Sequence, residues 1–310
     1  MAHSPHRIVI VGPGAIGTLL AVRLHAAGHE VHVLDHSPDR AARLNRDGLL
    51  LETETGRLRA RCRATTRAAD LPAADLAVVC VKCPALADAG RQLADLAHPT
   101  TLLTIQNGLG VLDALRQGLG AAAARHRLVA SVTYQAANRG PDGIVRHVAN
   151  LPTLLDGSPP LRPHAEAAAT LLGSAGLPAT VEDDLRPALW RKLAVNVAIN
   201  PLTALEEVRN GQLAERDDLR RQMLALAREA AAVARAEGVA LSDQQAEAAA
   251  LDAARATADN VSSMWQDVRA GRATEIEFLG TALLRLAAHH GLPLPATADV
   301  TARVRALKHA

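Results

Sequence analysis

Short apolar runs alternate with helical patterns along the first half of the chain. Residues 7–11 form a β-branched run that leads into a glycine, which is typical of a buried parallel strand. A helical period follows over 18–27, ends at Gly28, and gives way to an alternating strand over 30–34. Further buried strands are expected over 76–81, 101–105 and 128–132. The pattern predicts an α/β fold, with a doubly wound parallel sheet and helices on both of its faces.

The pattern changes near residue 184. Residues 138–155, with glycines at 140 and 143, predict antiparallel strands that close the first domain. Beyond them, stretches rich in Ala, Leu, Arg and Glu predict helices only, with Ser242 and Thr297 as N-caps and a capping box from Thr274 to Glu277. The expected helices span 184–200, 216–237, 242–270 with a break, 274–290 and 297–308. We therefore predict an α/β domain over 1–183 and an all-helical domain over 184–310.

Composition narrows the class of protein. The 310 residues are 49% hydrophobic and 21% charged, which excludes wholesale disorder. A net charge of +2 and 1% aromatic residues argue against nucleic-acid binding. No apolar run approaches the roughly 18 residues of a membrane span, and the first strand begins too early for a signal peptide. Three cysteines cannot form a disulfide framework in a chain of this length, so we expect a cytoplasmic protein.

Lysine is unusually rare. Of 34 cationic residues only Lys82, Lys192 and Lys308 are lysines, and Lys308 is expected to be a solvated tail residue. Arginine does not lose its proton in proteins, so a lysine kept against this bias suggests a compact ammonium or a proton that can leave. The alternative is codon drift.

A glycine-rich turn follows the first strand. It comprises Gly12, Pro13, Gly14, Ala15, Ile16 and Gly17. It opens a helix, and Asp35 follows Gly12 by 23 residues, at the end of the second strand, as in dinucleotide-binding units. Glycines let the backbone approach a pyrophosphate, which the helix N-terminus favours. The alternative is an ordinary tight turn between strand and helix.

Two polar residues end later strands of the predicted sheet. Lys82 and Asn107 lie at the carboxyl ends of their strands, the edge at which doubly wound sheets bind ligands; otherwise they are solvated loop residues. Cys80 and Cys83 form a CxxC pair without a second pair or suitably spaced histidines. We therefore expect the two cysteines to be packing residues, and we expect no metal site.

The helix over 184–200 carries a polar row. Lys192, Asn196 and Asn200 recur every fourth residue and share one face of an otherwise apolar helix. Such a row is solvated, paired internally or lines a ligand cleft, and the last interpretation is favoured because exposed helix faces elsewhere use Arg, Glu, Asp and Gln. Asn200 precedes Pro201, which is expected to kink or end the helix. Glu275 precedes the next expected helix and is a further candidate site residue. The alternative is that it only stabilises the first turn of that helix, as acids in this position commonly do.

Taken together, these residues resemble the ketopantoate reductase (2-dehydropantoate 2-reductase) family. The resemblance covers essentially the whole chain and rests on the following segments in order: the glycine turn, 81–82, 106–110, 189–196, 199–204, 262–267 and 274–277. It implies a Rossmann domain followed by a helical domain like the C-terminal domain of 6-phosphogluconate dehydrogenase. The implied reaction is hydride transfer from a nicotinamide to the C2 ketone of ketopantoate, which gives pantoate, a precursor of pantothenate and coenzyme A.

The resemblance also implies roles for individual residues. Lys192 matches the proton donor, and Glu275 matches a residue of the catalytic site that also contacts the cofactor. The matches to substrate-binding residues are Asn107, Asn196, Asn200, Asn210 and Ser263. Beyond the glycine turn, the matches to residues near the cofactor are Lys82, Asn107 and Ala137. Asp35 and His36 are further cofactor candidates because they follow the second strand.

The residues after the second strand and the family resemblance predict different cofactors. Many family members have an arginine after the second strand that grips the 2′-phosphate of NADPH, whereas this chain has Asp35 and His36. An acid there typically accepts hydrogen bonds from the ribose of NAD. Arg40 could fold back over a phosphate. We expect NADP(H), with NAD(H) tolerated.

Two further departures concern the substrate. Cys83–Pro84 follows Lys82, and Gly280–Thr281 stands where Asn-Gly is common. A sister reductase for another 2-keto acid and a nucleotide-sensing protein without catalysis are the alternatives. The expected partner is a small keto-acid substrate, with no nucleic acid and no membrane. The sequence does not decide between a monomer and a homodimer.

Overall fold

The computed structural model describes residues 5–140 and 142–307, so the tail residue Lys308 lies outside the described residues. The chain forms two compact units. The first contains the chain up to Gln106 and Val111–Leu185, and the second contains Asn107–Gly110 and the chain from Arg186 onward. Each unit has its own hydrophobic core.

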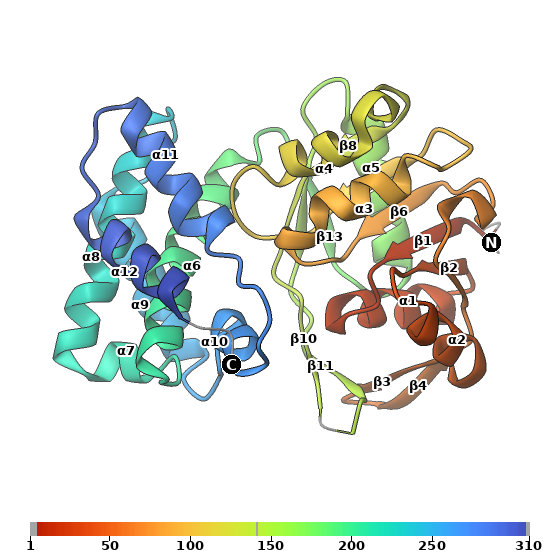
Figure 1. Cartoon of the computed structure of the whole chain (residues 1–310), viewed down its shortest axis with the longest axis horizontal. Coiled ribbons are helices and arrows are strands. Elements are labelled where there is room, and N and C mark those ends of the chain that lie inside the picture. The colour runs from red at the N-terminus through yellow and green to blue at the C-terminus, as the bar shows by residue number, and fades with distance from the viewer. Residues whose placement is uncertain (1–4, 141, 308–310) are drawn as a thin grey trace. The chain divides into compact units, whose positions relative to one another are not determined.

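A six-stranded, fully parallel sheet organises the first unit (Figure 1). Its strand order, β5-β2-β1-β6-β7-β8, reverses direction at β1, as in doubly wound folds. The strands are β1 (Arg7–Val11), β2 (Glu30–Leu34), β5 (Arg63–Thr65), β6 (Leu76–Val79), β7 (Thr101–Thr104) and β8 (Arg127–Val129). The predicted parallel sheet is confirmed.

Helices and two smaller sheets surround this sheet, and Figure 1 shows α1 and α3 on opposite sides of it. The helices are α1 (Ala15–Ala26), α2 (Pro38–Asp47), α3 (Leu86–Leu93), α4 (Val111–Leu119) and α5 (Arg162–Ser174), with short 3₁₀ turns at Ala68–Asp70, Cys83–Ala85 and Gly120–Arg125. One small sheet has the order β10-β11-β3-β4, from Ala136–Arg139, Val145–Ala149, Leu49–Thr53 and Gly56–Ala60. The other has the order β13-β12-β9, from Ala179–Glu182, Thr153–Asp156 and Ser131–Thr133. Helix α1 packs against both the parallel sheet and the β10-β11-β3-β4 sheet.

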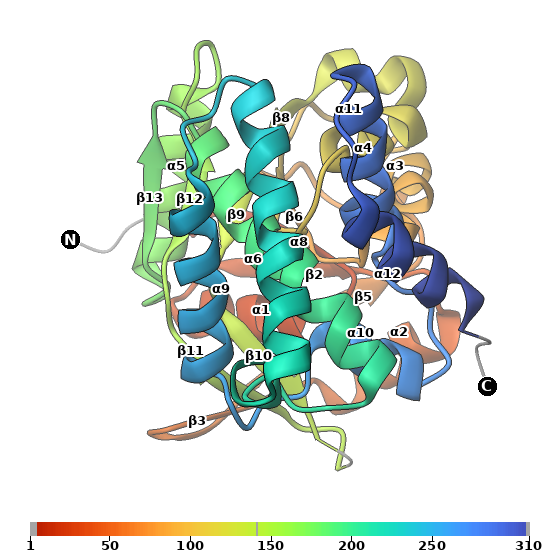
Figure 2. The ribbon, with the colours of Figure 1, turned by 90° about the vertical axis from the view of Figure 1, so that its left-hand side faces the viewer.

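The second unit is all-helical, as predicted. Its central helix α6 packs against α8, α9, α10 and α12 (Figures 1 and 2). The helices are α6 (Arg186–Glu206), α7 (Gln212–Glu215), α8 (Asp217–Ala236), α9 (Asp243–Ala256), α10 (Ser263–Arg269), α11 (Ala282–His289) and α12 (Pro295–Ala306), with a π-helical turn at Glu277–Thr281. Among the described helices, none is both long enough and apolar enough to cross a membrane.

Several local expectations were wrong. Residues 128–132 do not form one strand, because the chain leaves the parallel sheet after β8 and enters the β13-β12-β9 sheet as β9. Helix α6 does not end at Pro201 but continues to Glu206, because buried residues beyond the proline pack into the core and offset the lost backbone hydrogen bond.

Two of the three expected caps are also absent. Ser242 does cap α9 in a capping box with Gln245, as predicted. Thr274 and Glu277 form no capping box, because helical structure begins only at Glu277 and its carboxylate pairs with Arg305. Thr297 lies inside α12 rather than at its N-cap.

Candidate active site and nucleotide site

The glycine-rich turn connects β1 to α1 and has the geometry of a close backbone approach. Gly12 adopts a φ of +88°, and a Cβ there would lie 2.6 Å from Cγ1 of Val81. A Cβ on Gly17 would lie 2.2 Å from the carbonyl oxygen of Gly12. Both positions therefore require glycine.

The start of α1 fits a phosphate group. The N-cap is Gly14, which provides no side-chain cap for the helix. A Cβ on Gly14 would have nothing within 4 Å, so the space beside the turn is open. A helix N-terminus with free N–H groups and open space favours an anion, so this part of the chain fits a dinucleotide pyrophosphate.

Asp35 lies just after β2, and its charge is compensated inside the first unit. Its side chain has no exposed surface, and Arg40 donates hydrogen bonds to both of its carboxylate oxygens. Burial alone would raise the pKa of Asp35, but the hydrogen bonds from Arg40 and the Ser37 N–H hold it below its usual value. Arg40 thus folds onto Asp35, whereas the side chain of His36 is exposed.

Two of the other predicted cofactor contacts, Lys82 and Ala137, belong to the first unit, and Asn107 belongs to the second. Lys82 is exposed just after β6, and Ala137 is half-buried in β10. The side chain of Gln106 donates to the carbonyl oxygens of Val79 and Val81, both at 2.7 Å, and so fixes the chain before Asn107.

Asn107 itself begins the short segment that belongs to the helical unit. There the Leu109 N–H donates to the carbonyl oxygen of Phe278 at 2.8 Å. Gly108, with a φ of +107°, has no room for a Cβ beside the same oxygen. The turn after β7 is therefore fixed against the π-helical turn that follows Glu275.

The polar row on α6 is not a solvated surface stripe. Lys192 and Asn196 are half-buried, and Asn200 is buried. The amide nitrogen of Asn196 is buried without a hydrogen-bond partner among the described residues. A buried amide without a protein partner is unusual, and its N–H can donate to a bound ligand or to a water molecule.

Lys192 has the properties of a group that can release a proton. Although the residue is half-buried by surface area, its surroundings are dense, and burial lowers the pKa of its ammonium to about 8. The negative charge of Glu275 opposes this effect and raises the pKa. Glu275 is thus close enough to act on Lys192, and it lies just before the helical turn rather than inside it.

Several predicted site residues also share a small cavity in the helical unit. Asn200, Ser263 and Glu275 line it, together with Met264, Asp267 and Leu279. The structure therefore brings together a part of α6, the first turn of α10 and the segment before the π-helical turn. Asp267 is buried and accepts a hydrogen bond from Arg272 at 2.9 Å.

Asn210 is not among the residues that line this cavity. Its side-chain nitrogen donates to Oγ1 of Thr257 at 2.8 Å, and its N–H donates to the carbonyl oxygen of Asn260. Its carboxamide oxygen is buried without a partner among the described residues. One acceptor of Asn210 is therefore available.

The cysteine pair has the surroundings of packing residues. Cys83 is buried, and burial raises the pKa of the Cys80 thiol, which disfavours the thiolate that redox or metal chemistry needs. Within residues 5–140 and 142–307, no cluster of three or more His, Cys, Asp or Glu is arranged to hold a metal ion.

A doubly wound sheet with an open glycine-rich turn is typical of dinucleotide-binding domains, and a lysine of lowered pKa in the second unit is suited to general acid catalysis, which together fit a dinucleotide-dependent oxidoreductase. Sequence models described as ketopantoate reductase PanE/ApbA and ketopantoate reductase PanE/ApbA C terminal match residues 8–157 and 184–308. The chain therefore belongs to the ketopantoate reductase family, whose members are NAD(P)-dependent reductases.

Individual relatives agree over the full length. The chain is 36% identical to 2-dehydropantoate 2-reductase of Halobacterium salinarum, over 96% of this chain and 98% of that protein. A crystal structure of a PanE/ApbA family ketopantoate reductase from Ralstonia eutropha is 31% identical, with a TM-score of 0.87 over 97% of this chain and 98% of that one. A ternary structure of D-mandelate dehydrogenase with NADH and anilino(oxo)acetate is 23% identical, with a TM-score of 0.88 over 97% of each chain, and shares the fold.

Proposed function

We propose that the protein reduces 2-dehydropantoate (ketopantoate) to pantoate, the reductase step on the way to pantothenate and coenzyme A. The observation that carries this proposal is Lys192, a lysine with a pKa near 8 beside Glu275, on the same helix face as Asn196 and Asn200. Membership of the ketopantoate reductase family supports the choice of substrate.

The first unit would hold the dinucleotide. The backbone of Gly12–Gly17 and the N-terminus of α1 would bind the pyrophosphate. When bound, the reduced nicotinamide supplies the hydride that reduces the ketone at C2. Lys82, Asn107 and Ala137 would contact the cofactor, as the family resemblance implies. We propose NADP(H) as the preferred cofactor; NAD(H) remains the weaker substitute.

Lys192 would act as the general acid. Its ammonium would hydrogen-bond to the carbonyl oxygen of the substrate, stabilise the charge that develops there and transfer a proton to it. A pKa near 8 keeps most of the lysine protonated at pH 7 while making the proton easier to release than from an ordinary lysine. Glu275 would keep the pKa from falling further and so preserve the acid form.

Three polar side chains would bind the keto acid. The unpartnered amide nitrogen of Asn196 would donate to a substrate oxygen, because a buried donor without a partner is costly. Asn200 and Ser263 line the same cavity as Glu275 and would contact the carboxylate and hydroxyl groups of the substrate. Asn107 and, through its free carboxamide oxygen, Asn210 complete the set of proposed substrate residues.

A direct kinetic assay tests this proposal. Oxidation of NADPH and of NADH is followed by absorbance with ketopantoate, with pyruvate as a smaller keto acid and with benzoylformate as a larger one. We expect the highest kcat/KM for ketopantoate. Nucleotide binding without turnover of any keto acid would contradict the proposal and indicate a sensing protein.

The second candidate is a sister reductase of another 2-keto acid. The observation that favours it is Gly280–Thr281, which replaces a pair common in the family and lies within the π-helical turn that follows Glu275. A Cβ on Gly280 would lie 2.1 Å from Oγ1 of Thr301, so the local packing of this chain requires glycine there. A clear kinetic preference for benzoylformate or pyruvate over ketopantoate would select this candidate.

A further inference from the structure

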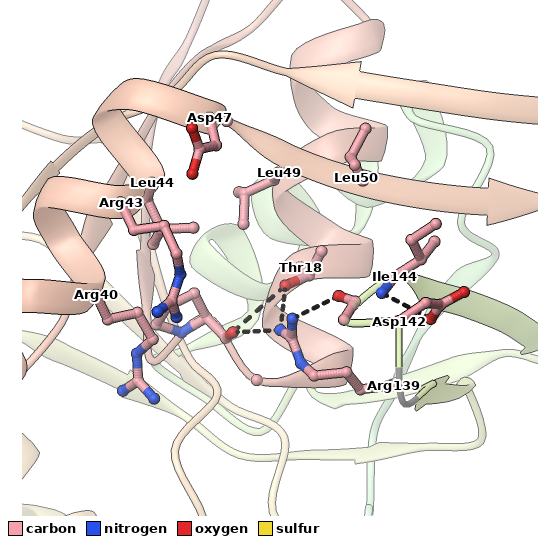
Figure 3. A pocket seen from close by; sticks show the side chains of 14 residues that line it. Thr18, Arg40, Arg43, Leu44, Asp47, Leu49, Leu50, Arg139, Asp142 and Ile144 are labelled. Carbon is pink, nitrogen blue, oxygen red and sulfur yellow. Dashed lines mark hydrogen bonds between the residues drawn. The ribbon is translucent and has the colours of Figure 1, made fainter.

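A cavity of about 510 Å³ lies beside the glycine-rich turn, entirely within the first unit. It is formed by the start of α1, by α2 with the first residues of β3, and by the hairpin from β10 to β11 (Figure 3). Pro13 and Gly14 of the turn line it, and so do three arginines from two elements: Arg40 and Arg43 from α2, and Arg139 from β10.

The two acids that line this cavity have their own counter-charges. Asp47 pairs with Arg46 at 2.9 Å, and Asp142 pairs with Arg146 at 2.6 Å. Neither of those arginines lines the cavity. Arg40 in turn compensates the buried Asp35. These pairs account for every charge of the lining except those of Arg43 and Arg139.

Arg139 and Arg43 carry positive charges without a carboxylate partner. Arg139 donates only to neutral acceptors: Pro13 O at 3.0 Å, Thr18 Oγ1 at 3.2 Å and Gly143 O at 2.9 Å. Arg43 makes no hydrogen bond or ion pair with any residue of the described parts of the chain. Burial and the charges of Arg40 and Arg43 lower the pKa of Arg139, so these guanidinium groups repel one another.

Two uncompensated guanidinium groups match one phosphate monoester. Such a group carries a charge of about −1.5 to −2 at pH 7, and guanidinium binds phosphate through paired hydrogen bonds. The cavity adjoins the turn where the pyrophosphate of a dinucleotide is expected, and Arg139 lies two residues beyond Ala137, on the same face of β10. The ester phosphate of NADP(H) is therefore the anion of the right charge next to this turn.

We infer that Arg43 and Arg139 bind the 2′-phosphate of NADP(H) and replace the arginine that many family members carry after the second strand. This inference rests on the proposed function, because it assumes that a dinucleotide occupies the turn. The Asp35–Arg40 pair removes the main obstacle, since the carboxylate is buried and neutralised and so does not repel a phosphate.

The test compares two ligands that differ only in the phosphate concerned. Isothermal titration gives the Kd of adenosine 2′,5′-bisphosphate and of 5′-AMP for the wild type, Arg43→Ala, Arg139→Ala and the double variant. Arg116→Ala is the matched control: it removes one exposed, Asp113-paired arginine of the first unit that does not line the cavity. Melting temperatures check that each variant is folded, and Arg43, which is exposed and unpartnered, is the safer substitution.

We expect the wild type and Arg116→Ala to prefer the bisphosphate, each single cavity variant to weaken it about tenfold, and 5′-AMP affinity to stay constant. No wild-type preference, or unchanged selectivity in the folded Arg43→Ala and double variants, would overturn the inference. So would inorganic phosphate that binds together with the bisphosphate, since the cavity would then serve a separate phosphate. Ketopantoate turnover, measured independently with each cofactor, tests the proposed function without these variants.

Discussion

The arginine-lined cavity beside the glycine-rich turn and the small cavity of the helical unit differ in the kind of positive charge that lies at each of them. The first has a volume of about 510 Å³, and its charges without a partner carboxylate are arginines, which stay protonated under all physiological conditions. The second is small, partly apolar, and lies near a lysine whose pKa has fallen to about 8. Fixed charges suit binding of an anion, whereas a labile proton suits reduction of a ketone. In a chain with only three lysines, the proposed role as proton donor accounts for a lysine rather than an arginine at position 192.

The largest expected effect comes from removing that labile proton. Lys192→Ala should lower kcat by about 10² or more, the usual scale for a positioned proton donor, with little change in the Kd of NADPH. Steady-state kinetics and fluorescence titration of NADPH measure the two quantities. Lys192→Arg is the matched control: it keeps the charge but cannot release the proton, so we expect it to be nearly as slow. Near-normal turnover in either variant would refute the assignment.

A smaller effect is expected from Asn200 at the same helix face. Asn200→Ala should raise the KM for ketopantoate by about tenfold to a hundredfold, since a hydrogen bond to a charged group contributes about 1.5–3 kcal/mol. Cofactor affinity should stay the same, because Asn200 is assigned to the substrate and not to the cofactor. The measurement is KM for each substrate in turn. An unchanged KM for ketopantoate would mean that Asn200 only supports the helix at Pro201.

The smallest expected change concerns the end of β2. Asp35→Ala/His36→Arg should raise the ratio of kcat/KM for NADPH to that for NADH by a few-fold, because the variant gains a cation and frees Arg40 from Asp35. A moderate gain is expected because Asp35 is already neutralised in the wild type. If the ratio does not rise, these two positions do not read the 2′ group of the cofactor.

The two regions also differ in how far the sequence predicts them. Lys192, Asn196 and Asn200 could be recognised because one helix sets their spacing, and the Ser242 cap is likewise local. The arginine-lined cavity of the first unit could not be predicted in this way, because Arg139 contacts Pro13 across 126 positions of the chain. In the sequence, only its position two residues after Ala137, a predicted cofactor residue, could have pointed to Arg139 as a cofactor-binding candidate.

Long-range contacts also explain the failed caps. The α12 N–H groups of Ala296 and Thr297 donate to the carboxylate of Glu229 in α8, at 2.9 and 2.7 Å. A carboxylate from another helix therefore replaces the expected cap of Thr297 on its own helix. A contact that the sequence did not predict also changes the interpretation of Asp35. Its position after β2 predicts hydrogen bonds to the ribose of NAD, but its charge is neutralised by Arg40 of α2.

The pH dependence of kcat with ketopantoate, measured for the wild type and Glu275→Gln, tests most directly whether the proton of Lys192 is used in catalysis. The acid must be protonated, so kcat should be full at neutral pH and fall as the pH rises through about 8. Glu275 raises the pKa of Lys192, so its neutral replacement should move this fall to lower pH. A fall at the same pH in both proteins, or none in the wild type up to the ordinary pKa of lysine, would contradict the account.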